Sequence, residues 1–220
     1  PKDGAEFITI SHASVPGKRQ VDMLGWLNGS PVGAIEEAPV AGGDDLADIY
    51  FKAGELAARV HNQAAEWRLP PGFDRHAWDV DGLVGPEPLW GKFWELEALS
   101  RAQRKLMLEA RERLAGDLGA FGKGPDRYSL IHADFVPENL FREEDALKLI
   151  DFDDAGFGWH MFEIATALFF HLGRSDFSEL RDAIFAGYRT MRPLSEEQEA
   201  ALPMFLLLRS LTYLGWVHTR

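Results

Sequence analysis

The order of apolar and polar positions divides the chain into a short β-rich beginning and a long helical remainder. Residues 6–15 interleave β-branched and polar side chains, which predicts a strand. A Pro-Gly-Lys turn at 16–18 separates it from a second predicted strand at 19–27, and another turn is predicted at 28–31. We therefore expect a β-hairpin at the amino end.

Helical periodicity begins at residue 44. The segment 44–67 carries acidic residues near its start, which suit the positive end of a helix dipole, and it stops before a Pro-Pro-Gly sequence. His61 lies near its apolar stripe, and we expect a core or interface histidine there and not a metal ligand. The residues that recur at helical spacing, and that we expect to be buried, are Ile49, Leu56, Val60 and Ala64.

Later segments are also predicted to be helical. Residues 93–118 should form one long helix or two shorter ones, and 161–172 is apolar enough for a central buried helix. Segments 177–192 and 195–219 complete a helical carboxy-terminal region, with Ser195 as a candidate capping-box residue. The chain is therefore expected to be an α+β protein, mostly helical.

Two short apolar runs, at 129–131 and 147–150, each end at an acidic loop. We expect both to be strands that pair with each other across the loop between them. A Gly-Phe-Gly-Trp sequence at 156–159 is expected to be a turn that lets the backbone pass close to the second loop.

The two acidic loops carry the chemistry of the chain. His132, Asp134 and Asn139 form the pattern H-x-D-x-x-x-x-N, and Asp151 follows the second apolar run. An amide oxygen and a carboxylate are hard ligands suited to magnesium, and a second carboxylate can orient a hydroxyl and accept its proton. The alternative is that these residues only cap turns around a hairpin, which Asp and Asn often do.

The amino-acid sequences of the two acidic loops resemble those of a known family. The sequences HADFVPEN at 132–139 and IDFDD at 150–154 resemble the aminoglycoside phosphotransferase family, which includes choline kinases, and are closest to its bacterial homoserine kinase and stress-response kinase branches. Protein kinases carry H-R-D-x-x-x-x-N and D-F-G in the same roles. Asp153 replaces that glycine here, which favours small-molecule kinases.

The resemblance implies a protein-kinase-like fold of which this chain would contain only the end of the small lobe and the whole large lobe. Residues 1–30 would be the end of the small lobe, with its two strands and hinge, and 31–220 the helical large lobe. Leu24, Gly25 and Trp26 would be the hinge residues whose backbone faces adenine. The residues by themselves are equally compatible with an ordinary edge hairpin.

The resemblance also assigns roles within the loops. Asp134 would be the catalytic base, Asn139 and Asp151 the magnesium ligands, and His132 a structural residue that holds the catalytic loop. These assignments imply ATP and Mg²⁺ as cofactors.

Asp153 and Asp154 directly follow the second motif and are open to two interpretations. They could bind a second metal ion or an amino group of the substrate, or they could cap the following turn.

No phosphate-binding motif precedes the two acidic loops. The chain has neither G-x-x-x-x-G-K-[ST] nor G-x-G-x-x-G, and Lys2, Lys18 and Lys52 are the only lysines in its first sixty residues. The resemblance places the glycine-rich loop upstream of Pro1, in about a hundred further residues. We expect this chain alone to bind ATP poorly.

Bulk properties narrow the function further. The net charge of −12 argues against nucleic acid as a partner, and the absence of cysteine excludes disulfides and thiolate metal sites. The apolar segment 200–217 is interrupted by Pro203 and Arg209, so a membrane span is not expected. A cytoplasmic location is expected, since no signal peptide is visible.

Together these features predict an ATP-dependent phosphotransferase. The acceptor would be a hydroxyl of a small molecule such as an amino alcohol, homoserine or an aminoglycoside-like compound, and the oligomeric state stays open. Two rivals remain: a metal-dependent phosphohydrolase built on the acidic cluster, and a kinase-like scaffold without catalysis.

Overall fold

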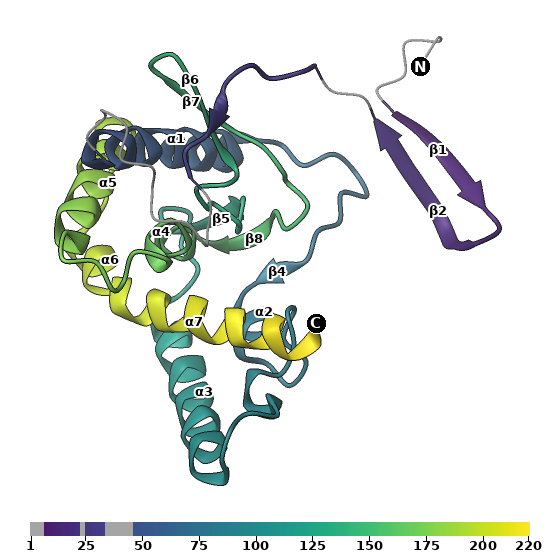
Figure 1. The fold of residues 1–220 in the computed structure, drawn as a ribbon, viewed down its shortest axis with the longest axis vertical. Coiled ribbons are helices and arrows are strands. Elements are labelled where there is room, and N and C mark those ends of the chain that lie inside the picture. The colour runs from purple at the N-terminus through teal and green to yellow at the C-terminus, as the bar shows by residue number, and fades with distance from the viewer. Residues whose placement is uncertain (1–6, 23–24, 34–45) are drawn as a thin grey trace.

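A mainly helical body carries two small sheets, and a separate β-hairpin lies at the amino end (Figure 1). The computed structural model describes residues 7–22, 25–33 and 46–220. The α+β class is confirmed. The helices are α1 (Leu46–Glu66), α2 (Val80–Val84), the 3-10 helix η1 (Phe93–Glu95), α3 (Arg101–Phe121), α4 (His160–Phe169), α5 (Phe177–Met191), α6 (Glu196–Ala200) and α7 (Leu202–Thr219). The strands are β1 (Phe7–His12), β2 (Val15–Asp22), β3 (Ser30–Pro31), β4 (Ala77–Trp78), β5 (Tyr128–Ile131), β6 (Leu140–Glu143), β7 (Ala146–Leu149) and β8 (Gly156–Trp159).

The predicted amino-terminal hairpin is present, but its turn lies elsewhere. β1 and β2 pair antiparallel, and the chain reverses at residues 13–14 instead of 16–18. Residues 16–17 are skipped in the pairing and form a bulge, in which Gly17 has a φ of +76°. The Pro-Gly pair therefore bends the second strand, which ends at Asp22 and not at residue 27.

The predicted pairing of 129–131 with 147–150 is wrong. β5 pairs antiparallel with β8, and β7 pairs antiparallel with β6. The sheets have the orders β4-β8-β5 and β3-β6-β7. A tight turn in which Glu144 has a φ of +53° connects β6 to β7, so this hairpin closes locally at lower entropic cost than the longer pairing.

The Gly-Phe-Gly-Trp sequence is a strand, not a turn. It forms β8, the middle strand of its sheet, parallel to β4 and antiparallel to β5. A Cβ at Gly156 would crowd the His76 carbonyl, and one at Gly158 would crowd Ile131. Glycine is required here because neighbouring chains approach the strand closely.

The buried face of α1 differs from the predicted one. Its fully buried residues are mostly small, and the close approach of α5 requires this: a Cβ at Gly54 would collide with the Ile184 carbonyl, and one at Gly187 with the Phe51 carbonyl. The predicted stripe is only half-buried. His61 is fully buried, as expected of a core histidine. The buried set is Tyr50, Ala53, Gly54, Ala57, Ala58 and His61.

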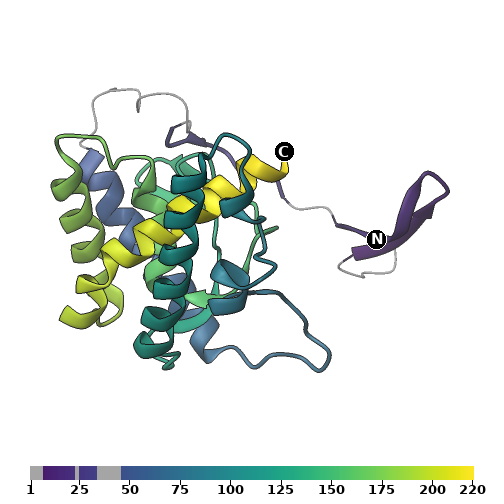
Figure 2. The same cartoon turned by 90° about the horizontal axis from the view of Figure 1, so that it is seen from below.

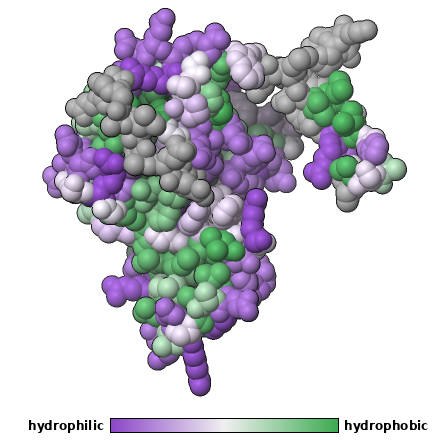
Figure 3. Space-filling view, in the orientation of Figure 1, coloured by the Kyte–Doolittle hydropathy of each residue, from purple (hydrophilic) through white to green (hydrophobic). Residues whose placement is uncertain are grey.

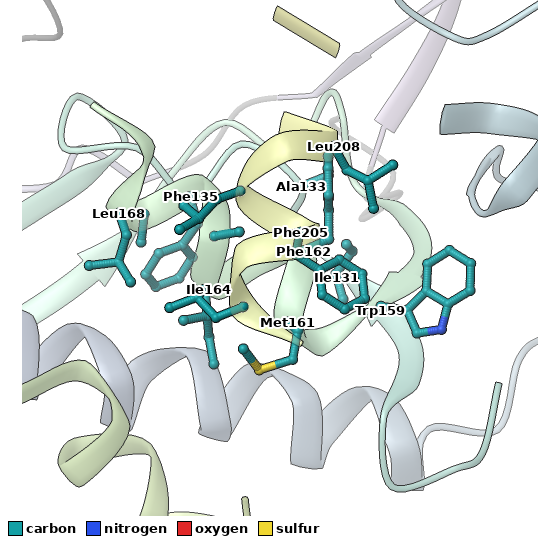
Figure 4. Packing of buried hydrophobic residues seen from close by; sticks show 14 of the residues in the cluster. Ile131, Ala133, Phe135, Trp159, Met161, Phe162, Ile164, Leu168, Phe205 and Leu208 are labelled. Atoms are coloured by element: carbon teal, nitrogen blue, oxygen red, sulfur yellow. The ribbon is translucent and has the colours of Figure 1, made fainter. Parts of the chain in front are cut away.

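α4 is the centre of the core, as predicted for segment 161–172, although it ends at Phe169. Every residue from His160 to Leu168 is buried. Figure 4 shows Phe162 and Ile164 of α4 among the packed side chains of the core, which also include Phe205 of α7. No helix among the described residues has the length and apolar character needed to cross a membrane.

Capping boxes define the starts of two helices. The predicted segment 93–118 is split into η1 and α3, and Ser100 with Gln103 caps α3. The predicted box at Ser195 is confirmed, with Gln198 as its partner, but it begins the short α6. α7 follows as a separate helix.

Substituting Gly187 by Ala should destabilise the protein. The added methyl collides with the backbone of α1, and overpacking of this kind costs about 1–3 kcal/mol. Gly116→Ala in the exposed part of α3 is the matched control, because nothing lies within 4 Å of its Cβ position. That change should raise stability by up to about 1 kcal/mol through helix propensity. Urea unfolding measures the unfolding free energy of both variants. Equal changes in Gly187→Ala and Gly116→Ala would contradict the packing argument.

Candidate active site

The catalytic loop, residues 132–139, connects β5 to β6 and brings Asp134 and Asn139 together. Asn139 Nδ2 donates to Asp134 Oδ2 at 3.0 Å and to the Asp134 carbonyl at 2.9 Å. The amide nitrogen is therefore engaged. No hydrogen bond from the described residues reaches Asn139 Oδ1. This oxygen is therefore available to coordinate a cation.

Glu163 of α4 holds the start of the catalytic loop. Its carboxylate is fully buried and accepts the backbone N–H of His132 at 2.9 Å and of Ala133 at 2.7 Å. Ala133 has a φ of +65°, a left-handed value that costs energy outside glycine. Burial opposes the charge on Glu163, but the nearby His61 ring, whose Nε2 lies 3.6 Å from Glu163 Oε1, and the hydrogen bond from the His132 amide hold the pKa of Glu163 below its usual value. A charged Glu163 therefore fixes a strained backbone.

His132 lies between the two acidic loops. It is fully buried; its Nε2 donates to the Ile150 carbonyl at 2.9 Å, and its Nδ1 accepts the Asp134 N–H at 3.3 Å. This pattern corresponds to the neutral imidazole with the proton on Nε2. The ring also contacts Phe152 edge-on, with centroids 4.7 Å apart. His132 thus connects Asp134 to the residue that precedes Asp151.

Residues 150–155, which we call the Asp151 loop, follow β7. The Ile150 N–H donates to the Asn139 carbonyl at 3.1 Å, so Asn139 and Asp151 lie at the same end of the β6–β7 hairpin. Asp151 has a φ of +63°, and its Oδ1 accepts the Asp153 N–H at 3.4 Å. The Asp151 side chain is exposed, in contrast to His132.

Arg209 is a site residue that sequence reasoning missed. It lies on α7, is 1% exposed, and donates from Nη2 to Asp134 Oδ1 at 3.1 Å. Its guanidinium lies 4.8 Å above the ring of Trp90. Burial lowers the pKa of Arg209, and Asp134 opposes this, so the guanidinium stays charged. Its one signal was a lone charge inside a very apolar helix, which usually indicates a buried ion pair.

Asp154 lies near Asp134, and Trp90 contacts both Asp154 and Arg209. It is half-buried, and Trp90 Nε1 donates to its Oδ1 at 3.3 Å. Its carbonyl accepts from Trp78 Nε1 at 2.8 Å, which fixes the backbone. Burial, together with the nearby Asp134, raises the pKa of the Asp154 carboxyl. Sequence reasoning had no signal for the tryptophan contacts.

The predicted hinge residues lie outside the loops. Gly25 and Trp26 belong to an irregular segment that leads into β3, and Trp26 is 92% exposed. β3 pairs with β6, which begins next to Asn139. Leu24 lies outside the described residues.

A family profile accounts for this arrangement of loops. The profile of the phosphotransferase enzyme family matches residues 11–199. The chain belongs to this family. The match includes both the catalytic loop and the Asp151 loop, so the resemblance stated from their sequences is confirmed.

Solved and curated relatives agree with this placement. A microcompartment-associated aminopropanol kinase is 32% identical with a TM-score of 0.80, over 100% of this chain and 66% of its own. An amicoumacin kinase in complex with AMP-PNP and Ca²⁺ is 20% identical with a TM-score of 0.73, over 99% and 62%. A homoserine kinase of Mesorhizobium japonicum is 31% identical over 70% of this chain and 46% of its own length.

Two facts follow from these similarities. The fold is protein-kinase-like, as predicted. The chain spans about half to two thirds of the length of these relatives.

Substituting Glu163 by Gln should weaken the catalytic loop. One oxygen becomes an NH₂ group that faces a backbone N–H, which costs about 1–3 kcal/mol of unfolding free energy. Because the folded pKa of Glu163 lies below its usual 4.5, its contribution is complete above that pH and is lost as the pH falls through the folded value. Urea unfolding measured across this pH range should show the loss of unfolding free energy in the wild type and not in Glu163→Gln. Glu179→Gln, at an exposed position on α5, should change little.

Proposed function

We propose that the intact protein is an ATP-dependent phosphotransferase that moves the γ-phosphoryl group to a hydroxyl of a small molecule. The observation that carries the proposal is the Asp134 carboxylate, held by Asn139 on one oxygen and by Arg209 on the other, beside the Asp151 loop. The relatives named above are kinases of small molecules, which supports this reaction class.

Asp134 is proposed as the catalytic base. The acceptor hydroxyl gives its proton to the carboxylate while its oxygen attacks the γ-phosphorus, and the bond to the β-phosphate oxygen breaks to release ADP. The contacts from Asn139 and Arg209 orient the carboxylate, and such positioning supplies most of the catalysis in phosphoryl transfer. His132 is proposed to keep the loop in place through its bond to the Ile150 carbonyl.

Asn139 and Asp151 are proposed to hold Mg²⁺. The free Oδ1 of Asn139 and the exposed carboxylate of Asp151 are hard oxygen donors at one end of the β6–β7 hairpin, which suits a cation that also binds phosphate oxygens. When bound, the metal would neutralise charge on the phosphates. The amicoumacin kinase complex with AMP-PNP and Ca²⁺ supports nucleotide and divalent-metal use in the family.

Asp154 is proposed to recognise an amino group of the acceptor. Its carboxylate is half-buried next to Asp134, and Trp90 leaves part of it available. A buried carboxylate beside an aromatic ring favours an ammonium group over a hydrated metal. Asp153 is exposed, so a second-metal role fits it better. Amino alcohols, homoserine and aminoglycoside-like compounds all carry such an amine.

The remaining parts of the proposal concern the intact protein. Residues 1–30 are proposed as the end of a small lobe, with Leu24, Gly25 and Trp26 as the hinge, and 31–220 as the large lobe. A segment upstream of Pro1 would carry the glycine-rich loop that binds the phosphates. A cytoplasmic location, and no nucleic-acid partner, stay predictions from the sequence.

The rival functions are less well supported. Among the described residues, no group of three or more His, Cys, Asp or Glu could hold a metal, as a two-metal phosphohydrolase requires. A scaffold without catalysis would have no need for Arg209 to be buried against Asp134.

Replacing Asp134 by Asn in the intact protein should lower kcat by about 10²–10⁴-fold, the usual contribution of a general base. The nucleotide dissociation constant should change little, because Asn keeps the shape and its contact to Asn139. Turnover of ATP with an acceptor panel, alongside equilibrium nucleotide binding, separates the two quantities. Unchanged turnover would falsify the base assignment.

Replacing Asp154 by Asn should raise the KM for amine-bearing acceptors by about 10–100-fold, the loss of one charge-assisted hydrogen bond. The KM for ATP should stay near its wild-type value. Asp153→Asn is the neighbouring control and should leave the acceptor KM nearly unchanged. If both variants raise the acceptor KM equally, the amine is not bound by Asp154 specifically.

A further inference from the structure

Arg75, an arginine outside the contacts of Asp134, holds two neighbouring peptides of the Asp151 loop. Its Nη2 donates to the Phe152 carbonyl at 2.9 Å, and its Nη1 donates to the Asp153 carbonyl at 3.1 Å. A guanidinium is a planar fork that can bridge two carbonyl oxygens in this way, whereas the ammonium group of lysine acts as a point charge. Arg75 therefore fixes the orientation of two consecutive peptide planes.

The carbonyl of the next residue, Asp154, is held by the same part of the chain. It accepts from His76 Nε2 at 3.0 Å and from Trp78 Nε1 at 2.8 Å. Trp78 is 1% exposed, so one of these donors is fixed in the core. Three consecutive carbonyls of the Asp151 loop thus accept hydrogen bonds from one short segment, residues 75–78.

The pairing of β4 with β8 places this segment beside the loop. β4 is parallel to β8, with Ala77 opposite Phe157, and the Phe157 N–H donates to the His76 carbonyl at 3.0 Å. A Cβ at Gly156 would lie 2.6 Å from the His76 carbonyl oxygen and 3.0 Å from His76 Nε2, the atom that donates to Asp154. Glycine at this position therefore lets His76 approach the loop.

The Asp151 loop needs support from outside. Asp151 has a φ of +63°, a conformation that persists only where surrounding contacts hold it. Within the loop, the Asp153 N–H donates to Asp151 Oδ1 at the long distance of 3.4 Å, and the Ala155 N–H donates to the Phe152 carbonyl at 3.1 Å. Arg75 shares that carbonyl with Ala155, so its loss would loosen the turn itself.

The position of Arg75 at the surface makes its effect local. Arg75 lies near the end of the loop 67–76, which projects from the body before the chain returns as β4 (Figures 1 and 2). Figure 3 shows mainly hydrophilic residues on this side of the body. Arg75 is exposed, and water competes for its two hydrogen bonds. We therefore expect Arg75 to contribute little to global stability and more to the geometry of the Asp151 loop.

We propose that Arg75 is a positioning residue for phosphoryl transfer, which rests on the proposed function. By fixing the peptides between Asp151 and Asp154, it sets the direction of the proposed metal ligand relative to the proposed amine-binding carboxylate. Such placement matters because a displacement of about 1 Å in the reacting groups can lower the rate by about 10²-fold. One guanidinium thereby aligns the nucleotide side and the acceptor side of the site.

Three variants of the intact protein test this inference. Arg75→Ala removes both hydrogen bonds, and Arg75→Lys keeps the charge without the fork. Arg68→Ala is the matched control, since Arg68 is an exposed arginine on the same loop that makes no hydrogen bond to the described residues. The urea unfolding midpoint should be nearly the same in all three variants.

Four measurements on Arg75→Ala give the expected result. Amide hydrogen exchange at 150–155 should be several-fold faster than in wild type. The Mg²⁺ concentration for half-maximal AMP-PNP binding and the KM for amine-bearing acceptors should each rise about 10-fold, the lower end of the usual effect of residues that orient metal ligands. The KM for acceptors without an amine should change less. Arg75→Lys should resemble Arg75→Ala, and Arg68→Ala should resemble wild type.

A double-mutant cycle tests whether Arg75 acts on the acceptor through Asp154. Contacts that act through a shared group are not additive. Arg75→Ala should therefore raise the acceptor KM much less in the Asp154→Asn background than in wild type. Equal increases in the two backgrounds overturn the proposed route through Asp154.

Other outcomes separate the positioning role from the proposed function. Full recovery in Arg75→Lys overturns the positioning role, because charge alone would then be sufficient. Faster exchange at 150–155 with unchanged Mg²⁺ dependence and acceptor KM also overturns it, because Arg75 would then be structural only. Kinase activity in wild type with every quantity unchanged in Arg75→Ala contradicts only the positioning role. Weaker Mg²⁺-dependent AMP-PNP binding in Arg75→Ala, in a protein whose wild type transfers no phosphoryl group, supports the positioning of Asp151 and contradicts the proposed function.

Discussion

The arrangement of the site depends on one buried charge, the carboxylate of Glu163. Removing a carboxylate from water costs several kcal/mol unless its oxygens are satisfied. Both oxygens of Glu163 accept backbone N–H groups where the chain leaves β5, so the cost of burial is offset by fixing the catalytic loop. The loop is therefore attached to α4, a helix in which every residue from His160 to Leu168 is buried.

From that anchor, contacts lead to both acidic loops. His132 connects the catalytic loop to the carbonyl before Asp151, and Arg209 approaches Asp134 from α7. Ala133 and Asp151 both have left-handed backbone conformations, which persist only where surrounding contacts hold them. Strain and buried charge coincide at the residues proposed for catalysis, whereas the helices around them are regular.

Local signals were sufficient for most elements and failed where a distant partner decides the outcome. The helices α1, α4 and α5 and the capping box at Ser195 follow from spacing within a few residues. The partners of the strands could not be predicted from local spacing. The glycines at 156 and 158 indicate a turn when the segment is considered alone, whereas in the structure β4 and β5 pair with it and make it a strand. The buried face of α1 was assigned wrongly because Gly54 and Gly187 permit a contact that hydrophobicity does not report.

The family could be predicted from the residues alone, and so could the candidate residues of the catalytic loop, since the spacing of Asp134 and Asn139 is a local property of one loop. Only the tertiary structure brought Glu163 and Arg209 to that loop, from positions 30 and 75 residues away along the chain. Their role depends on buried electrostatics, and a charge in an apolar helix has no defined partner until the helices pack. Chemistry encoded within one loop can be read from its residues, but the support of that loop is a property of the fold.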